Sequence, residues 1–297
     1  MGPITTYQDM VAVVTGGASG VGRSLTAMML DRGATVVIAD VEKQALDATV
    51  EELSSRGPVE GVLVDVTDPA SVQSLADHVF NTYGRTNVLF NNAGVGGAAP
   101  KVWECTPNDW NWIMAVNVFG VTYGIHSFVP RMIESGAPGY VVNTTSHNGA
   151  VTMLPHSSVY AVSKAAVAVL TECLESQLRE VAPNVGAGLL FPSGQGLMGT
   201  GMYTADRNRP DRWAREVPKA APPAQFAAMI ERNLQMRGQF VDALDELANS
   251  VLDGIVEGNY ILTLGDFDGS IQQLHERADR YAAGLNPTPP STALTAT

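Results

Sequence analysis

Short apolar runs alternate with amphipathic stretches along most of this chain of 297 residues. Residues 11–15 (VAVVT) and 35–40 (TVVIAD) are apolar runs rich in β-branched side chains, which are typical of strands buried on both faces of a parallel sheet. The same pattern predicts further strands at 60–65, 87–91, 139–145, 186–191 and 259–264. Amphipathic stretches predict helices at 23–33, 42–56, 69–83, 107–135, 160–181 and 241–257. This alternation predicts an α/β fold with a doubly wound parallel sheet.

Two segments interrupt the alternation. Residues 195–240 are rich in Gly, Pro, Met and aromatic residues, and a loop this long in a compact domain often covers a binding site. We expect a substrate lid there, with Met198, Tyr203 and Trp213 as candidate lining residues, although each also fits simple packing on the body. Residues 284–297 form a Pro/Thr-rich tail that is expected to be disordered or to lie on a partner subunit. The chain is therefore predicted to be one domain, residues 1–283, with a lid and a tail.

Composition narrows the class of protein. The net charge of -12 argues against a nucleic-acid or anionic-membrane surface, because both require clustered Lys and Arg. The first ten residues lack a basic region and an apolar run, and no later stretch looks long and apolar enough to cross a bilayer. Cys105 and Cys173 are not near a ligand-like cluster, so we expect two reduced thiols and no metal site. These features predict a cytoplasmic protein.

A glycine-rich turn follows the first predicted strand. The sequence GGASGVG at 16–22 lies between that strand and a helix, where glycines let the backbone approach a pyrophosphate and the helix N-terminus offers N–H groups. The strand after this helix ends in Asp40, the position expected to bind the adenosine ribose hydroxyls. The residues expected to hold the phosphates are Gly16, Ser19, Gly20, Val21 and Gly22. The motif predicts a bound dinucleotide.

Asp40 favours NAD over NADP because its carboxylate repels a 2′-phosphate. Ser19 stands where a basic residue would bind that phosphate, which also favours NAD, whereas Arg23 lies nearby and would partly offset the acid. Further cofactor contacts are expected where the following strands end. They are predicted at Asp65 and Val66 near the adenine and at Asn92, Ala93 and Gly94, whose small residues allow close approach.

Tyr160 and Lys164 lie four residues apart at the start of a predicted helix, and therefore on one face of it. A free tyrosine has a pKa of about 10, and a neighbouring ammonium favours the phenolate. The pair alone also fits a packed tyrosine beside an extended lysine. Asn117 lies inside the predicted helix 107–135, where its amide either faces solvent or serves a polar pocket.

Taken together, these motifs resemble the short-chain dehydrogenase/reductase family, whose fold is the Rossmann fold. The resemblance runs over residues 8–195 and again over 241–265. It implies that Tyr160 is the general acid/base, that Ser146 orients the substrate oxygen, and that Lys164 lowers the Tyr160 pKa and binds the nicotinamide ribose. It also implies that Asn117 holds a proton-relay water and that Pro192 lies at the nicotinamide. No metal is required.

The sequence departs from the family pattern at three places, one of which is the segment after Pro192-Ser193-Gly194, which is longer than the family average. One extra residue separates Ser146 from Tyr160, and Ser146 is assigned because it stands three residues before Gly149. The extra residue is expected to bulge around Leu154-Pro155-His156. In addition, Pro192-Ser193-Gly194 replaces the usual Pro-Gly.

A closer resemblance, carried by Arg207-Asn208-Arg209-Pro210 and by GNYILT at 258–263, is to the branch that contains benzylic-alcohol Cα-dehydrogenases. It implies a bulky, apolar or aryl secondary alcohol or ketone as substrate. The family commonly pairs helices equivalent to 107–135 and 160–181 across subunits, so a homo-oligomer, a tetramer, is expected. The alternatives are an NADP-linked carbonyl reductase of the 3-oxoacyl type and a non-catalytic nucleotide sensor on the same fold.

Overall fold

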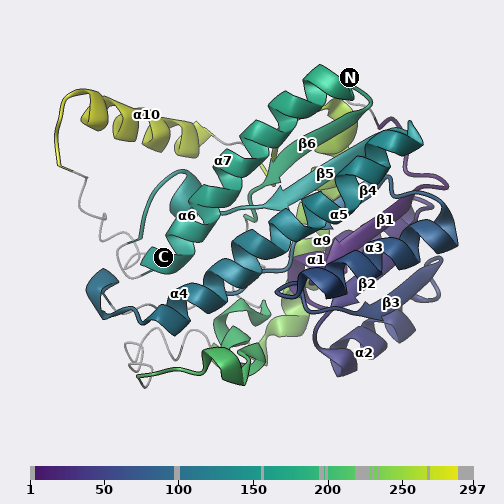
Figure 1. The fold of residues 1–297 in the computed structure, drawn as a ribbon, viewed down its shortest axis with the longest axis horizontal. Helices are drawn as coiled ribbons and strands as arrows, with labels where there is room; N and C mark the ends of the chain where they lie inside the picture. The colour runs from purple at the N-terminus through teal and green to yellow at the C-terminus, as the bar shows by residue number, and fades with distance from the viewer. Residues whose placement is uncertain are drawn as a thin grey trace.

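A seven-stranded parallel sheet lies at the centre of the computed structural model, in the strand order β3-β2-β1-β4-β5-β6-β7 (Figure 1). The strands are β1 Val11–Thr15, β2 Thr35–Asp40, β3 Val59–Leu63, β4 Val88–Asn91, β5 Gly139–Thr144, β6 Val185–Leu190 and β7 Ile261–Leu262. The chain changes direction across the sheet between β1 and β4, which is where open α/β sheets bind ligands. The predicted fold class, a doubly wound parallel sheet, is confirmed.

The structure describes residues 4–96, 101–154, 157–193, 197, 200–217, 228, 231–232, 235–265 and 268–286. Two sequence predictions lie outside these residues, namely Met198 as a lid residue and the bulge at Pro155-His156. The same holds for the side chain of Tyr203 and for all but the first three residues of the predicted tail 284–297.

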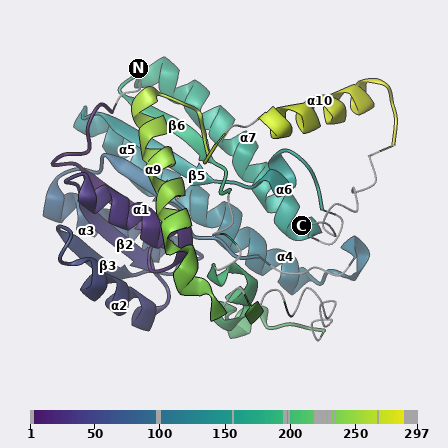
Figure 2. The same cartoon turned by 180° about the vertical axis from the view of Figure 1, so that it is seen from behind.

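Helices cover both faces of the sheet. One face carries α1 Gly20–Asp31, α2 Lys43–Leu53 and α9 Val241–Glu257 (Figure 2). The opposite face carries α3 Pro69–Tyr83, α5 Gly120–Ser135 and α7 Ser158–Val181 (Figure 1). Strand β1 shows why the strands are continuous apolar runs. Ala12 and Val14 pack in the core on the side of α1 and α9, whereas Val11 and Val13 pack in the core on the side of α3 and α5. Burial on both faces removes the alternation with polar residues.

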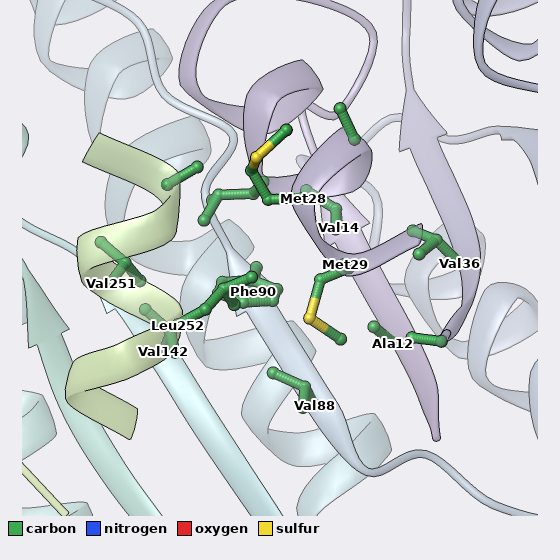
Figure 3. Packing of buried hydrophobic residues seen from close by; sticks show 14 of the residues in the cluster. Ala12, Val14, Met28, Met29, Val36, Val88, Phe90, Val142, Val251 and Leu252 are labelled. Carbon is green, nitrogen blue, oxygen red and sulfur yellow. The ribbon is translucent and has the colours of Figure 1, made fainter. Parts of the chain in front are cut away.

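The larger apolar core joins α1 and α9 to the sheet. Phe90 of β4 is fully buried and lies between Met29 of α1 and Leu252 of α9 (Figure 3). Large side chains of this kind contribute about 1.5–3 kcal/mol each when they are removed from water. This packing fixes α1 on the sheet and therefore fixes the position of its N-terminus.

The predicted helix 107–135 forms a continuous helical run of three parts. These are α4 Pro107–Met114, the π-helical segment η2 Ala115–Phe119 and α5 Gly120–Ser135. Thr106 and Asp109 form a capping box at its start, which satisfies N–H groups that would otherwise have no partner. The π-helical segment carries Asn117, and π segments are frequent at functional sites.

This run, Pro107–Ser135, meets the length and hydropathy requirements of a membrane-crossing helix, with a mean hydropathy of 1.3, so the expectation that no stretch does so was wrong. Of its most apolar window, 61% is buried inside the fold. Contacts with the sheet and with neighbouring helices therefore account for its apolar residues.

Several elements differ from the sequence prediction. Residues 268–282 form an additional helix, α10 Asp268–Ala282, which the sequence reading did not predict because its polar residues outnumber its apolar ones. Strand β7 is shorter than the predicted 259–264. The predicted lid is not wholly irregular, since it contains the 3-10 helices η4 Gly201–Asn208, η5 Asp211–Trp213 and η6 Arg237–Phe240. The remaining short elements are η1 Val102–Glu104 and α6 His147–Ala150.

Candidate active site

A cleft of about 340 Å³ opens at the carboxyl ends of the strands on either side of the switch between β1 and β4. Most of the sequence-predicted residues line it. They are Gly16, Ser19, Gly20, Val21, Asp40, Asp65, Val66, Asn92, Ala93, Gly94, Ser146, Tyr160, Lys164 and Pro192. Gly22 and Asn117 do not line the cleft and lie behind its wall.

The glycine turn places the N-terminus of α1 at the cleft. Ser19 precedes the helix in an extended conformation, its hydroxyl makes no capping hydrogen bond, and the first turn has no acidic residue. The helix N-terminus therefore retains N–H groups and a positive dipole end, which suit an anionic group. Gly22 has a packing role instead, because a Cβ there would lie 2.7 Å from Asn92 Nδ2 and in collision with Gly16 O.

Thr15 joins this turn to the end of β4. Its hydroxyl accepts hydrogen bonds from the backbone N–H groups of Asn92 (3.0 Å) and Ala93 (3.1 Å). Asn92 Nδ2 donates in return to Thr15 O at 3.0 Å. A Cβ on Gly16 would lie only 2.8 Å from Ala93 Cα, so the glycine allows the two segments to meet. The floor of the cleft is thereby held by side chains and not only by the sheet.

Two carboxylates mark the far end of the cleft. Asp40, at the end of β2, accepts hydrogen bonds from the backbone N–H groups of Ala18 (3.1 Å) and Glu42 (3.0 Å). Burial raises its pKa, although these hydrogen bonds act in the opposite direction. Asp65 accepts from Thr67 and lies 3.6 Å from Arg212. Arg23 does not line the cleft, and its Nε donates to Glu52 at 3.0 Å.

Asn117 has no exposed surface and makes three hydrogen bonds. Its Oδ1 accepts from Val95 N–H at 2.8 Å, and its Nδ2 donates to Val95 O and to Ser163 Oγ, both at 3.0 Å. Ser163 in turn donates to the carbonyl oxygen of Tyr160 at 2.7 Å. Asn117 therefore connects the loop after β4 to the first turn of α7. The sequence left open whether the Asn117 amide faces solvent or a polar pocket, and the structure shows it in a buried polar pocket.

Lys164 is buried, with its ammonium 5.8 Å from the centre of the Tyr160 ring. Its Nζ donates to Thr144 O at 2.7 Å, and a Cβ on Gly94 would lie 3.5 Å from Nζ and 3.6 Å from Asn117 Oδ1. Burial lowers the pKa of Lys164 to about 8, since removal from water disfavours the charged form. The predicted pairing of lysine and tyrosine on one helical face is present.

Ser146 lies at the end of β5, with its hydroxyl accepting from Asn148 N–H at 3.2 Å. The loop that follows turns back on α7 through Gly149, which has φ +120° and lies against the backbone of Ala161. Leu154 O accepts from Ser157 N–H at 3.1 Å, which closes the loop before Tyr160. Ser146 and Tyr160 therefore both border the cleft despite the extra residue between them.

Ser193, which stands after Pro192 where the family usually has a glycine, makes hydrogen bonds through its hydroxyl. Ser193 Oγ accepts from Leu264 N–H at 3.1 Å and from Thr263 Oγ1 at 3.0 Å. It also donates to Leu264 O at 3.2 Å. Through these hydrogen bonds, Ser193 connects the loop after β6 to the residues that follow β7.

The lid lines the cleft with residues that the sequence did not predict as lining residues. Those that line it are Leu197, Thr200, Gly201, Met202, Ala205, Arg207, Asn208 and Pro210. Trp213 does not line it and packs instead against a cluster that contains Trp112 and Ile113, which agrees with the alternative of packing on the body. Glu42 and Trp112 also line the cleft. Only the tertiary structure identifies most of these residues as cleft-lining. Glu42 could have been predicted, because it follows Asp40 by two residues.

The arrangement places a tyrosine, a buried lysine and a serine at one end of a cleft whose other end carries two acids and a helix N-terminus. These residues fit a nicotinamide dinucleotide, with the uncapped helix at the phosphates and Asp40 at the adenosine ribose. Within the described part of the chain, no group of three or more His, Cys, Asp or Glu is placed to hold a metal ion.

Known proteins are similar to this chain in sequence and in fold. The sequence model of the short chain dehydrogenase family matches residues 10–192. The chain is 38% identical to 1-deoxy-11-beta-hydroxypentalenate dehydrogenase of Streptomyces avermitilis over 58% of this chain and 64% of that protein, just under two thirds of its length. It is 34% identical to C alpha-dehydrogenase of a Sphingobium species over 70% of this chain and 66% of that protein.

Several of the similar solved structures contain a nicotinamide cofactor. A short chain dehydrogenase/reductase from Burkholderia phymatum in complex with NAD is 34% identical, has a TM-score of 0.84 and matches 97% of this chain and 100% of its own. A metagenomic short-chain oxidoreductase in complex with NADP is 27% identical, with a TM-score of 0.60 over 64% of this chain and 85% of its own. The chain therefore belongs to the short-chain dehydrogenase family, oxidoreductases that use a nicotinamide cofactor on hydroxyl or keto groups.

Proposed function

We propose that this protein is an NAD-dependent dehydrogenase that interconverts a bulky, largely apolar secondary alcohol and its ketone. The observation that carries the proposal is the shared cleft. It brings Ser146, Tyr160 and Lys164 together at one end and places Asp40 at the other. A non-catalytic nucleotide sensor would not require the first three residues at the same opening.

Tyr160 acts as general acid/base at its phenolic oxygen. It takes the hydroxyl proton when an alcohol is oxidised and returns it when a ketone is reduced. Ser146 holds the same substrate oxygen by a hydrogen bond, which aligns the carbon that exchanges a hydride. The bound nicotinamide supplies or accepts the hydride. The described residues contribute positioning and proton transfer.

Lys164 acts on Tyr160 through its charge. An ammonium 5.8 Å from the ring centre favours the phenolate form of Tyr160, and the same group would bind the nicotinamide ribose hydroxyls. Asn117 holds the loop after β4 and the first turn of α7 in register. From this position it orders the water that links Lys164 to solvent.

The proposed preference for NAD rests on charge at the adenosine end. Asp40 borders the cleft there, and Arg23 is engaged by Glu52 and does not offset it. A 2′-phosphate would be repelled by Asp40. The structural relative with NAD is also more similar to this chain than the one with NADP, which supports the same choice over an NADP-linked carbonyl reductase.

The proposed substrate class rests on the apolar side chains that line the cleft. Val95, Trp112, Val116, Met202 and Ala205 give the cleft an apolar surface, which suits a large hydrophobic alcohol. Two relatives are named 1-deoxy-11-beta-hydroxypentalenate dehydrogenase and C alpha-dehydrogenase. Because the lining is apolar, a bulky aryl secondary alcohol is the first class to test.

The test is a screen of secondary alcohols and ketones, aryl ones first, followed by NADH absorbance with wild type and Tyr160→Phe. We expect turnover with NAD(H), weaker turnover with NADP(H), and loss of turnover in Tyr160→Phe with NADH binding retained. Unchanged turnover in Tyr160→Phe would refute the catalytic assignment. Failure of every alcohol and ketone alongside tight NADH binding would favour the sensor.

The protein is also proposed to be a homo-oligomer, a tetramer, through the helical face formed by α5 and α7. Val162 and Val169 of α7 and Phe119 at the start of α5 are exposed apolar residues, and exposed apolar surface of this kind marks interaction sites. Light scattering at micromolar concentration tests this, and a monomer would contradict it.

A further inference from the structure

A second charged group lies beside Asp40 at the adenosine end of the cleft. Glu42 follows Asp40 by two residues, and its backbone N–H donates to Asp40 Oδ1 at 3.0 Å. The carboxylate of Glu42 accepts from Arg207 of the lid, through Nε at 3.1 Å and through Nη2, and from Asn208 Nδ2 at 2.8 Å. All three side chains border the cleft. The lid therefore contacts the protein body directly beside the expected ribose site.

Arg207 has a particular place in the charge distribution of the cleft. Among the described residues that line it, the cations are Arg207 and Lys164, and Lys164 lies at the end near Tyr160. Arg207 is thus the lining cation at the end where Asp40 lies. A guanidinium in this position matches a phosphate in charge and in hydrogen-bonding geometry.

The guanidinium of Arg207 is held by the lid as well as by Glu42. Its Nη1 donates to Thr204 Oγ1 at 2.8 Å and to Gly201 O at 3.1 Å. The lid itself is fixed elsewhere, since Arg209 and Arg215 both bind Asp109 of α4. Neutralising Glu42 is therefore expected to leave both the lid and the guanidinium in position.

We propose that Glu42 masks Arg207, and that this masking acts with Asp40 to exclude a cofactor that carries a 2′-phosphate. When Glu42 is ionised, its charge compensates the charge of Arg207, and the charge of Asp40 leaves the expected ribose site negative. Without Glu42, the same guanidinium becomes a receptor for the 2′-phosphate. The ion pair is partly exposed, with side chains 39% and 29% accessible, and such a pair adds little to stability. The function of the Glu42–Arg207 pair in this proposal is to select the cofactor.

The inference rests on the proposed preference for NAD, and its test uses binding instead of turnover. The probes are 2′,5′-ADP and 5′-AMP, which differ only in the 2′-phosphate, and their dissociation constants are measured by displacement of NADH fluorescence. In Glu42→Gln, we expect 2′,5′-ADP to bind about tenfold tighter, because one charge-assisted contact is gained, with little change for 5′-AMP. The additional change Arg207→Gln in this background should abolish the gain.

Asp253→Asn is the matched control, because it neutralises the carboxylate of another partly exposed ion pair, with Arg32, and neither residue lines the cleft. It should leave the ratio of the two dissociation constants unchanged. Glu42→Ser is a second variant that should behave as Glu42→Gln. An unchanged ratio in both Glu42 variants, or a gain that survives Arg207→Gln, would overturn the inference. A wild-type protein that prefers 2′,5′-ADP would instead refute the proposed NAD preference.

Discussion

Gly149 lies directly on the backbone of Ala161, and a Cβ on residue 149 would approach Ala161 Cα to 3.1 Å and its carbonyl carbon to 3.0 Å. Gly149 belongs to the loop after Ser146, and Ala161 follows Tyr160 in α7. This contact brings together the two segments that carry the serine and the tyrosine. It also gives a physical reason for the glycine three residues after Ser146, because its φ of +120° and the close approach both exclude a side chain.

We expect Gly149→Ala to reduce turnover at least tenfold, roughly the effect of misplacing a catalytic group by about 1 Å. Gly136→Ala is the matched control, because Gly136 also has a positive φ, +65°, but no atom within 4 Å of the added Cβ. Gly136→Ala should cost about 1 kcal/mol of stability and leave turnover unchanged. Steady-state kinetics and urea unfolding compare the two. Equal turnover would show that the contact does not position Ser146.

Replacing Asn117 with Ala should destabilise the protein by roughly 2–4 kcal/mol, because both the N–H and the C=O of Val95 lose a buried partner. Ser163→Ala removes only the hydroxyl that joins Asn117 to Tyr160 O and should cost about 1 kcal/mol. Urea unfolding measures both. If the two variants were equally stable, the bonds to Val95 would not be the main structural contribution of Asn117.

Lys164 should make stability depend on pH in a defined window. Burial lowers its pKa from 10.5 to about 8, so between these values the unfolded protein binds more protons and stability rises with pH. The buried ammonium costs up to about 3 kcal/mol below pH 8, and this cost disappears as pH approaches 10.5. Wild type should therefore gain stability relative to Lys164→Met between about pH 7 and about pH 10.

The comparison with Lys164→Met is made by urea unfolding at both pH values. Titrating groups that Lys164 does not affect are present in both proteins, so their effects cancel in the difference. A difference that does not vary with pH would mean that Lys164 keeps its ordinary pKa in the folded state.

Asp109 anchors the lid to α4. It accepts from Arg209 at 2.9 Å and from Arg215 at 3.1 Å, and the Arg209 side chain is only 5% exposed. Burial raises the pKa of Asp109, but hydrogen bonds from Arg209 and Thr106 outweigh this effect and keep the pKa below its ordinary value. We expect Asp109→Asn to loosen the lid and speed tryptic cleavage after Arg207, Arg212 and Arg215.

Asp253→Asn is the control for that experiment, since Asp253 pairs with Arg32 away from the lid. It should leave the cleavage rate at these arginines as in wild type. Equal rates in the two variants would mean that Asp109 does not hold the lid.

Much of the scaffold could be predicted from the sequence alone. The strands are visible because burial on both faces demands apolar runs such as 11–15, and the glycine turn is visible because a close backbone approach admits no side chain. These are local requirements, so each leaves a local pattern. Most of the residues proposed for the cofactor and for catalysis follow from such patterns, and they do border one cleft.

The tertiary structure alone decided the rest. The surroundings of Asn117, the position of Trp213 against α4, and the contact of Arg207 with Glu42 join segments that are far apart in the chain. One sequence carries no signal for such pairs, because the residues next to each partner in the chain are compatible with several different tertiary surroundings. Helix α10 was not predicted because its residues are mostly polar, and a mostly polar stretch next to the C-terminal tail has the composition of a loop. The sequence determined which elements form, and packing decided which side chains meet.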